Sequence, residues 1–126
     1  MVYEQNDGIV KVKVSDEKLD GWPIPVGSVV SGNPEASGKL LWQSDDKRTG
    51  NGIWACKVGI YNWDYTWDET IYIIEGEVTI TDRHNKSIVC GAGDLFFIPI
   101  GTKTTWNITK PIRKVFHFRS DEPVDL

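Results

Sequence analysis

Hydrophobic and polar residues alternate along most of this chain in short runs, as they do in β-strands, and no segment keeps a helical period of 3.6 residues. The only candidate for a helical turn is 15–20, where Ser15 would be the N-cap and acidic residues follow. The runs that combine alternation with β-branched or aromatic residues are 9–14, 40–42, 53–65, 70–74, 77–81, 87–89, 95–98, 104–108 and 113–118.

Turn-forming residues separate these runs at short intervals. Residues 82–86 read as a hairpin loop, 91–94 and 99–101 as tight turns, and Pro111 as the end of another segment. Many short strands separated in this way are typical of an antiparallel sandwich or barrel, so we predict an all-β fold.

The length allows one domain. A chain of 126 residues, of which 40% are hydrophobic, buries one core but not two. We therefore predict a single domain over 1–126, with an N-terminal strand and arm at 1–39, a barrel at 40–118 and a tail at 119–126. Residues 20–39 are rich in proline, glycine and serine, and we expect them to pack along the barrel or against a second subunit.

Charge and cysteine content limit the partners. The net charge is −4, and no run of basic residues is longer than Lys47-Arg48, which argues against nucleic acid and anionic membranes as partners. The N-terminus lacks the pattern of a signal peptide and no apolar stretch is long enough to span a membrane, so we expect a cytoplasmic protein. Cys56 and Cys90 are far apart in the sequence and are expected to be reduced, structural thiols.

Two glycine-bounded blocks carry the strongest pattern, namely 59–76 (GIYNWDYTWDETIYIIEG) and 93–106 (GDLFFIPIGTKTTW). Together they resemble the paired motifs of the cupin superfamily, which implies an RmlC-like jelly-roll β-barrel. In a metal-binding cupin the first motif supplies two histidines and a glutamate, and the second supplies a third histidine. In this chain only the glutamate, Glu69, is present, and the three histidine positions hold Trp63, Tyr65 and Thr104.

These substitutions should abolish tight metal binding. An indole N–H cannot ligate a metal, and neutral hydroxyl groups are poor ligands for the divalent ions that imidazoles hold. Neither of the two histidines, His84 and His117, stands at a motif position. We therefore predict no metal or other cofactor, and leave open only a weak site for a hard cation at Glu69 through bridging waters.

The resemblance is closer to one group, the small single-domain cupins similar to (S)-ureidoglycine aminohydrolase, which are relatives also of the ethanolamine-utilisation cupin. It implies a compact barrel and a homodimer. It does not imply the aminohydrolase activity, because those enzymes are manganese-dependent bicupins with histidine ligands. The matching positions include Gly52-Ile53-Trp54, Trp63-Asp64-Tyr65, Asp68-Glu69-Thr70, Ile74-Glu75-Gly76, Gly93-Asp94, Pro99, Gly101 and Thr105-Trp106.

Strand parity suggests how a pocket would be lined. Tyr61, Trp63 and Tyr65 share one face of their strand, and Glu69 points the same way if the count continues through Trp67. The second motif adds Thr104 and Trp106, so these aromatic and hydroxyl side chains would surround one carboxylate. A buried carboxylate needs a partner. The candidates are the Tyr65 hydroxyl, an indole N–H, Arg113, His117 and a bound ligand.

Two classes of function fit this pocket. In the first, the protein is a metal-independent enzyme acting on a small molecule, with Glu69 as acid or base and Tyr65 as hydrogen-bond donor. Its substrate would be bound by Trp63, Thr104, Trp106, Arg113 and His117. In the second, the protein is a non-catalytic binding or sensory module for a small metabolite. Structural roles are the alternative for each residue: core filling for the tryptophans, and hydrogen bonding for Glu69 and His117.

Overall fold

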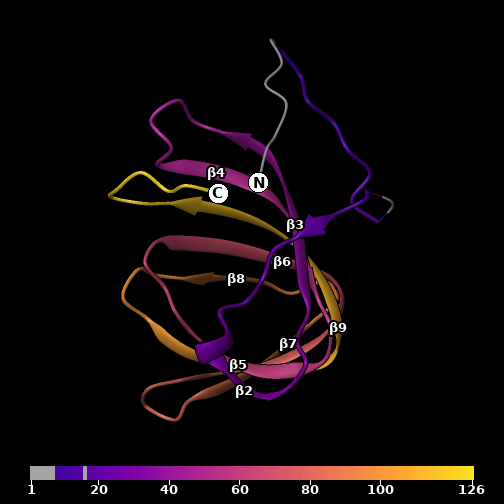
Figure 1. The fold of residues 1–126 in the computed structure, drawn as a ribbon, viewed down its shortest axis with the longest axis vertical. Helices are drawn as coiled ribbons and strands as arrows, with labels where there is room; N and C mark the ends of the chain where they lie inside the picture. The colour runs from indigo at the N-terminus through magenta and orange to yellow at the C-terminus, as the bar shows by residue number, and fades with distance from the viewer. Residues whose placement is uncertain (1–7, 16) are drawn as a thin grey trace.

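The computed structural model describes residues 8–15 and 17–126, and the strands of this part form a single nine-stranded sheet that curls on itself (Figure 1). One short 3-10 helix, Val26–Ser28, accompanies the sheet in the described residues. The strands are β1 Asp20–Gly21, β2 Val29–Gly32, β3 Ala36–Gln43, β4 Thr49–Cys56, β5 Gly59–Asp64, β6 Asp68–Asp82, β7 Ser87–Gly91, β8 Leu95–Ile98 and β9 Lys103–Arg119.

The two longest strands, β6 and β9, organise the barrel. They pair with each other in antiparallel register over most of their length. The outer edge of β9 pairs with β5 through its first half and with β4 through its second half. The outer edge of β6 pairs with β8 and then with β7. Because each long strand serves two neighbours in succession, the sheet bends into the predicted jelly-roll barrel (Figure 1).

The bend in β6 depends on Gly76. Its φ is +91°, in the left-handed region that favours glycine. A Cβ at this position would lie 2.1 Å from the Pro111 carbonyl oxygen of β9. The register between β6 and β9 shifts on both sides of this point. The sequence predicted strand breaks at Gly76 and Pro111, and the structure shows bends within continuous strands instead.

Most of the predicted strands are confirmed, but β1 and β2 were not predicted, and two strand predictions and the predicted helical turn differ from the structure. Residues 9–14 contain no strand, and 53–65 form two strands, β4 and β5, separated by residues 57–58. The helical turn predicted at 15–20 is not followed by a helix in the described residues, which exclude residue 16. The Glu17 N–H donates a hydrogen bond to the Lys13 carbonyl oxygen, which forms a single isolated turn.

The arm at 20–39 packs along the barrel, one of the two positions predicted for it. Strand β1 pairs with β3 and strand β2 pairs with β5. Between them, Trp22 and Ile24 pack against the buried core. The arm therefore covers the inner side of the sheet and helps to enclose the interior.

Side chains that point inward from the long strands form the core. Trp106 and Phe118 of β9 and Ile71 and Ile73 of β6 are fully buried.

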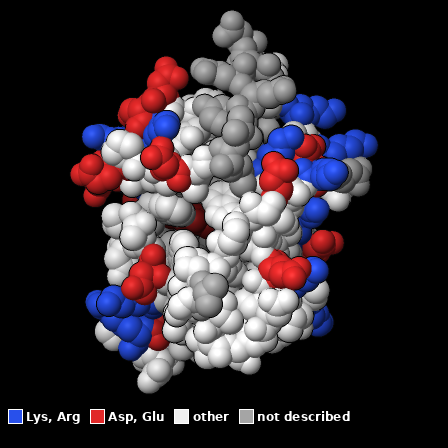
Figure 2. Space-filling model, viewed as in Figure 1, with Lys and Arg blue, Asp and Glu red and all other residues white. Residues whose placement is uncertain are grey.

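Among the described residues, the structure has no helix with the length and apolar character of a membrane span. On the face shown in Figure 2, charged side chains lie mainly toward the two ends, and a hollow opens among the uncharged residues between them.

Candidate functional site

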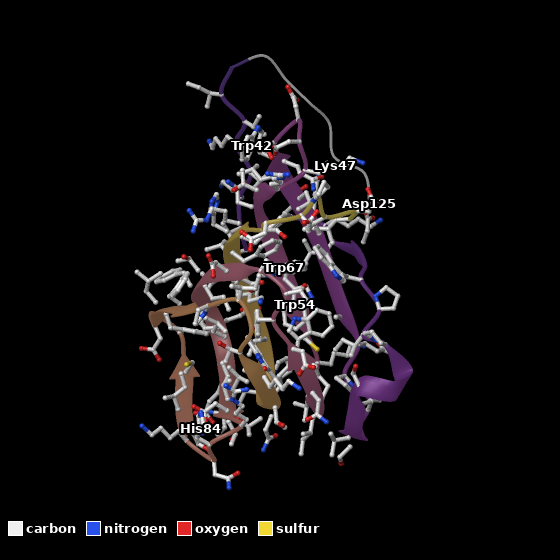
Figure 3. All side chains as sticks on the ribbon, turned by 90° about the vertical axis from the view of Figure 1, so that its left-hand side faces the viewer. Trp42, Lys47, Trp54, Trp67, His84 and Asp125 are labelled. Carbon is white, nitrogen blue, oxygen red and sulfur yellow. The ribbon has the colours of Figure 1, made fainter. Side chains whose placement is uncertain are left out.

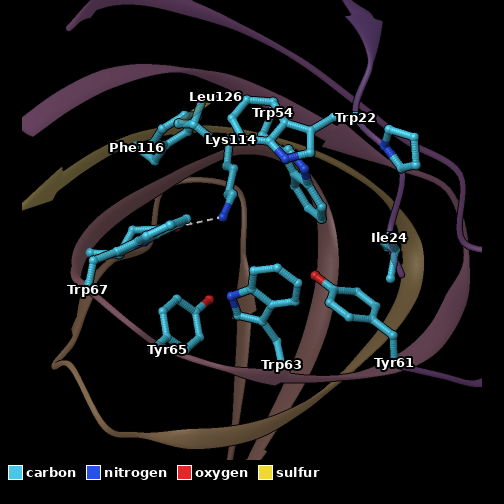
Figure 4. A pocket seen from close by; sticks show the side chains of 12 residues that line it. Trp22, Ile24, Trp54, Tyr61, Trp63, Tyr65, Trp67, Lys114, Phe116 and Leu126 are labelled. Atoms are coloured by element: carbon cyan, nitrogen blue, oxygen red, sulfur yellow. Dashed lines mark hydrogen bonds and ion pairs between the residues drawn. The ribbon is translucent and has the colours of Figure 1, made fainter. Parts of the chain in front are cut away.

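A pocket of about 130 Å³ lies inside the curled sheet, between its inner surface, the N-terminal arm and the end of the chain. Figure 4 shows Tyr61, Trp63 and Tyr65 projecting from one wall toward Lys114, which comes from the opposite wall beside Trp54. The lining residues are Trp22, Pro23, Ile24, Trp54, Tyr61, Trp63, Tyr65, Trp67, Glu69, Lys114, Phe116 and Leu126.

Glu69 lies inside the barrel, as strand parity predicted, and is only 5% exposed. Its Oε1 accepts a hydrogen bond from Trp67 Nε1 at 2.8 Å, and its Oε2 accepts one from Lys114 Nζ at 2.8 Å. An indole N–H was among the predicted partners, but Lys114 was not. Both carboxylate oxygens are therefore engaged by N–H donors.

Lys114 comes from the second half of β9 and is 6% exposed. Besides the ion pair with Glu69, its Nζ lies 4.7 Å from the centre of the Trp54 ring and 4.9 Å from that of Trp106. Aromatic ring faces attract cations, and a carboxylate is the usual partner of a buried ammonium. The surroundings of Lys114 thus compensate for the loss of water around its charge.

The prediction that Arg113 and His117 line the pocket is wrong. The Arg113 guanidinium donates to the Val14 carbonyl oxygen at 2.9 Å, outside the barrel. His117 is exposed, and its Nε2 lies 3.2 Å from Thr49 Oγ1. Both residues alternate with the inward side chains of Lys114 and its neighbours, so they occupy the opposite face of β9.

A sequence signal for Lys114 was available. Thr104 and Trp106 were expected to face inward, and the even-numbered positions of β9 keep this direction across Pro111. Counting onward from Trp106 leads to Lys114 and Phe116 inside the barrel. Lys114 was missed because the sequence analysis divided this segment into two strands at Pro111, whereas β9 is one continuous strand.

Thr104 and Trp106 are buried but do not line the pocket. Thr104 Oγ1 donates to the Trp63 carbonyl oxygen at 2.8 Å. Trp106 stacks on Tyr61 with ring centres 6.1 Å apart and meets Trp54 edge-on at 6.2 Å. Thr104 and Trp106 therefore contact the residues that line the pocket without lining it themselves. Trp63 and Tyr65 line the cavity, as predicted.

Two buried phenols border the cavity. Tyr61 and Tyr65 are each 4% exposed, and their hydroxyl groups point into the space drawn in Figure 4. Burial raises the pKa of both phenols well above the ordinary value, and the negative charge of Glu69 adds to each rise. Both groups therefore stay neutral O–H donors at physiological pH.

The Tyr61 hydroxyl and Trp106 Nε1 are among the donors around the pocket that make no hydrogen bond with the described residues. The Tyr61 hydroxyl faces the open space of the cavity (Figure 4). Trp106 Nε1 is fully buried without a partner of acceptable geometry, although its proximity to the Tyr65 hydroxyl slightly opposes the rise in that pKa. Buried donors without partners are rare in native structures, and a bound ligand or water is one way to satisfy them.

Both cysteines are free and buried, in agreement with the prediction of reduced thiols. Burial raises the pKa of Cys56 to about 12, although the positive charge of Lys114 acts in the opposite direction. Since the thiolate is the reactive form, Cys56 is not a nucleophile at neutral pH.

The residues present do not fit a metal ion. No group of three or more His, Cys, Asp or Glu side chains comes together in the described part of the chain. Of the four motif positions, only Glu69 has a strong ligand atom, and both of its oxygens accept N–H donors. The Lys114 ammonium supplies the positive charge beside this carboxylate, so a second cation there would meet repulsion.

The curled sheet with its inward-facing site defines a cupin barrel. An RmlC-like cupin from Shewanella frigidimarina superposes with a TM-score of 0.60 at 14% identity, covering 86% of this chain and 87% of that one. A Pseudomonas syringae protein of unknown function superposes with a TM-score of 0.75 at 20% identity, covering 82% of this chain and 45% of that one. These structures share the fold.

Residues 43–116 match the model of the EutQ-like cupin domain, and the chain belongs to this family. It is 28% identical over 110 residues to the Clostridioides difficile (strain 630) protein named acetate kinase EutQ, covering 85% of this chain and 62% of that protein. The chain thus spans less than two thirds of that relative. The structure of the Clostridium difficile EutQ protein superposes with a TM-score of 0.68 at 20% identity, covering 87% and 86% of the two chains.

A DUF861 family protein from Thermotoga maritima is 38% identical over 51% of this chain and 73% of that one, with a TM-score of 0.50. The comparisons therefore indicate a EutQ-like cupin rather than the narrower aminohydrolase-like group that the motifs suggested.

Proposed function

We propose that this EutQ-like cupin binds a small polar metabolite in its aromatic pocket without a tightly held metal, using the Lys114–Glu69 pair as polar anchor. The observation that supports this most directly is a buried ion pair beside an aromatic-walled cavity. A buried ion pair is often no more stable than well-packed apolar residues, and a cavity lowers stability. A barrel that contains both is better suited to holding a ligand than to stability alone.

The size of the pocket limits the ligand. The cavity volume of about 130 Å³ is close to that of an engineered protein cavity, of about 150 Å³, that binds benzene. Trp54, Trp63 and Trp67 present ring surfaces to this space. A flat molecule of roughly the size of benzene would contact these rings while its polar group reaches the ion pair.

Catalysis is the second candidate. Tyr65 and Glu69 border the same cavity, and Lys114 next to them carries exchangeable protons. In this hypothesis Glu69 is the acid or base and Tyr65 the hydrogen-bond donor. Binding alone is the simpler proposal, because both oxygens of Glu69 already accept hydrogen bonds.

The names of relatives add candidate ligands but no activity. The Clostridioides difficile relative is named an acetate kinase, and acetate is small enough for a cavity of about 130 Å³. Acetate therefore belongs among the test ligands. The sequence has no Gly-rich phosphate-binding loop, so we do not extend phosphoryl transfer to this chain. The aminohydrolase-like grouping stays a prediction from the motifs.

Homodimer formation and a cytoplasmic location also remain proposals. The outer surface of β7 and β8 exposes the apolar side chains of Val89, Leu95 and Phe97. A second copy of the chain would bury them. Two free thiols are consistent with a reducing compartment.

The proposal is tested by titrating a panel of small metabolites, acetate included, into the 15N-labelled protein and following the indole N–H resonances. We expect binders to shift the signals of Trp63 and Trp67. Replacing Trp63 by alanine should weaken binding roughly tenfold, because a stacking surface is lost. Trp42→Ala is the matched control, since Trp42 lies away from the pocket near one end of the barrel (Figure 3). An affinity that is unchanged in Trp63→Ala, or binders that leave the pocket signals unmoved, would overturn the proposal.

A further inference from the structure

The polar groups around the cavity are mostly hydrogen-bond donors. The hydroxyls of Tyr61 and Tyr65 and the N–H of Trp63 border it, and Lys114 has N–H groups beyond the one bonded to Glu69. Glu69 has the only side-chain carboxylate among the described lining residues, and it already accepts two hydrogen bonds. A ligand that complements these groups therefore brings acceptor oxygens.

The charges of the lining residues favour a neutral ligand. Lys114 and Glu69 are the only ionised side chains among the lining residues that the structure describes, and they form an ion pair with a distance of 2.8 Å. Burial raises the pKa of Tyr61, and the nearby Cys56 and Glu69 add to the rise, so negative charge at that hydroxyl is disfavoured. Burial and the charge of Glu69 likewise disfavour a carboxylate placed beside Tyr61.

Tyr61 is the most informative single group. It is 4% exposed, borders the cavity, and its hydroxyl has no hydrogen-bond partner within the described residues. The hydroxyl faces the cavity, where an acceptor group of a ligand can take the place of water (Figure 4). Its ring stacks on Trp106, which fixes the position of the hydroxyl oxygen.

We infer that the ligand of this pocket is a small neutral carbonyl compound of the amide or ketone class, whose oxygen accepts hydrogen bonds from the Tyr61 hydroxyl and the Lys114 ammonium. This inference rests on the proposed function and adds the chemical class of the ligand. The apolar part of the compound lies between Trp54 and Trp63.

The test compares butyramide with butyrate, which have the same shape but differ in charge. Binding is followed by the indole N–H resonances of the intact protein at neutral pH. We expect butyramide to bind at least roughly tenfold more tightly than butyrate, because the carboxylate bears the cost of a buried charge. A ketone of similar size, such as 2-pentanone, should bind like the amide.

Tyr61→Phe is the matched variant. It removes only the unpartnered hydroxyl, so the free protein should fold at least as well as the original. We expect its affinity for butyramide to fall roughly threefold to tenfold, the loss of one hydrogen bond. Tyr72→Phe, on the exposed outer side of β6, is the control and should leave the affinity unchanged.

Two outcomes would overturn this inference while leaving the proposed function intact. One is tighter binding of butyrate than of butyramide with shifts at Trp63 and Trp67, and the other is unchanged butyramide affinity in Tyr61→Phe. If neither compound nor any metabolite of the panel shifts the pocket signals, the inference and the proposed function both fail.

Discussion

At the scale of single residues, the interior of this barrel is governed by Lys114 and Glu69. Each of the two charges is nearly excluded from water and each depends on the other, with Trp67 and the ring faces of Trp54 and Trp106 as additional partners. Removing one member of such a pair leaves an uncompensated buried charge, whereas removing both together does not.

This dependence predicts a double-mutant cycle. Lys114→Met and Glu69→Gln should each lower the free energy of unfolding by about 3–5 kcal/mol, as is usual for breaking a buried ion pair. The double variant should lose much less than the sum, because no unpaired charge remains. Urea unfolding of the four proteins measures this coupling. Additive losses would mean that the two groups do not interact in solution.

The buried Cys56 thiol and the buried phenols of Tyr61 and Tyr65 should make the stability of the fold decrease at high pH. The folded-state pKa of Cys56 is about 12, above its ordinary value of 9.0, so the protonated thiol stabilises the native state. This contribution is complete below pH 9.0 and is lost as the pH rises toward 12. The raised pKa values of Tyr61 and Tyr65 act in the same direction above pH 10.0.

The denaturation midpoint should therefore fall between pH 9.0 and 12, and it should fall less in Cys56→Ala than in the unmodified protein. Cys90→Ala is the matched control, because burial raises the pKa of Cys90 less than that of Cys56. A midpoint that stays constant across this range would contradict the buried state of the thiol and the phenols.

At the scale of elements, local patterns predicted most strands but not how they join. Alternation identified β3, β7 and β8 and the inward direction of Glu69 correctly. Gly76 and Pro111 were interpreted as strand ends, since such residues usually stop strands. In the barrel they face each other at a bend of β6 and β9, a long-range contact that no local pattern contains.

The bend gives a prediction with an internal control. Gly76→Ala should lower the free energy of unfolding by about 4 kcal/mol or more, because the added Cβ would lie 2.1 Å from the Pro111 carbonyl oxygen. Gly93→Ala has nearly the same φ, +93°, but meets no atom within 4 Å, so it should cost only about 1–2 kcal/mol. Thermal unfolding of both variants distinguishes backbone strain from the clash. Equal losses would contradict the close approach of the two strands.

At the scale of the whole molecule, the sequence predicted the class of fold more completely than the site. The spaced glycines, proline and glutamate indicated a cupin barrel, and the family match agrees. The motifs could not predict the parts of the pocket lining that come from the N-terminal arm and from the last residues of the sequence. Trp22 and Ile24 come from the arm and Leu126 from the far end of the chain, and only the closed barrel brings them beside Lys114.

The proposed homodimer is also tested at this scale. If a second copy covers the apolar outer surface of β7 and β8, the protein should have twice the monomer mass in light scattering coupled to size exclusion. Replacing Phe97 by lysine should then shift it to the monomer, since a charge would be buried in the interface. Val58→Lys, in the turn between β4 and β5, is the control and should keep the dimer. A monomer at every concentration would contradict this proposal.

The most direct test of the central claim is a high-resolution crystal structure of the protein with butyramide. The account predicts Lys114 Nζ within hydrogen-bond distance of Glu69 and density for the ligand between Lys114 and Tyr61. A metal ion on Glu69 with Lys114 displaced, or a barrel interior filled by side chains, would contradict it.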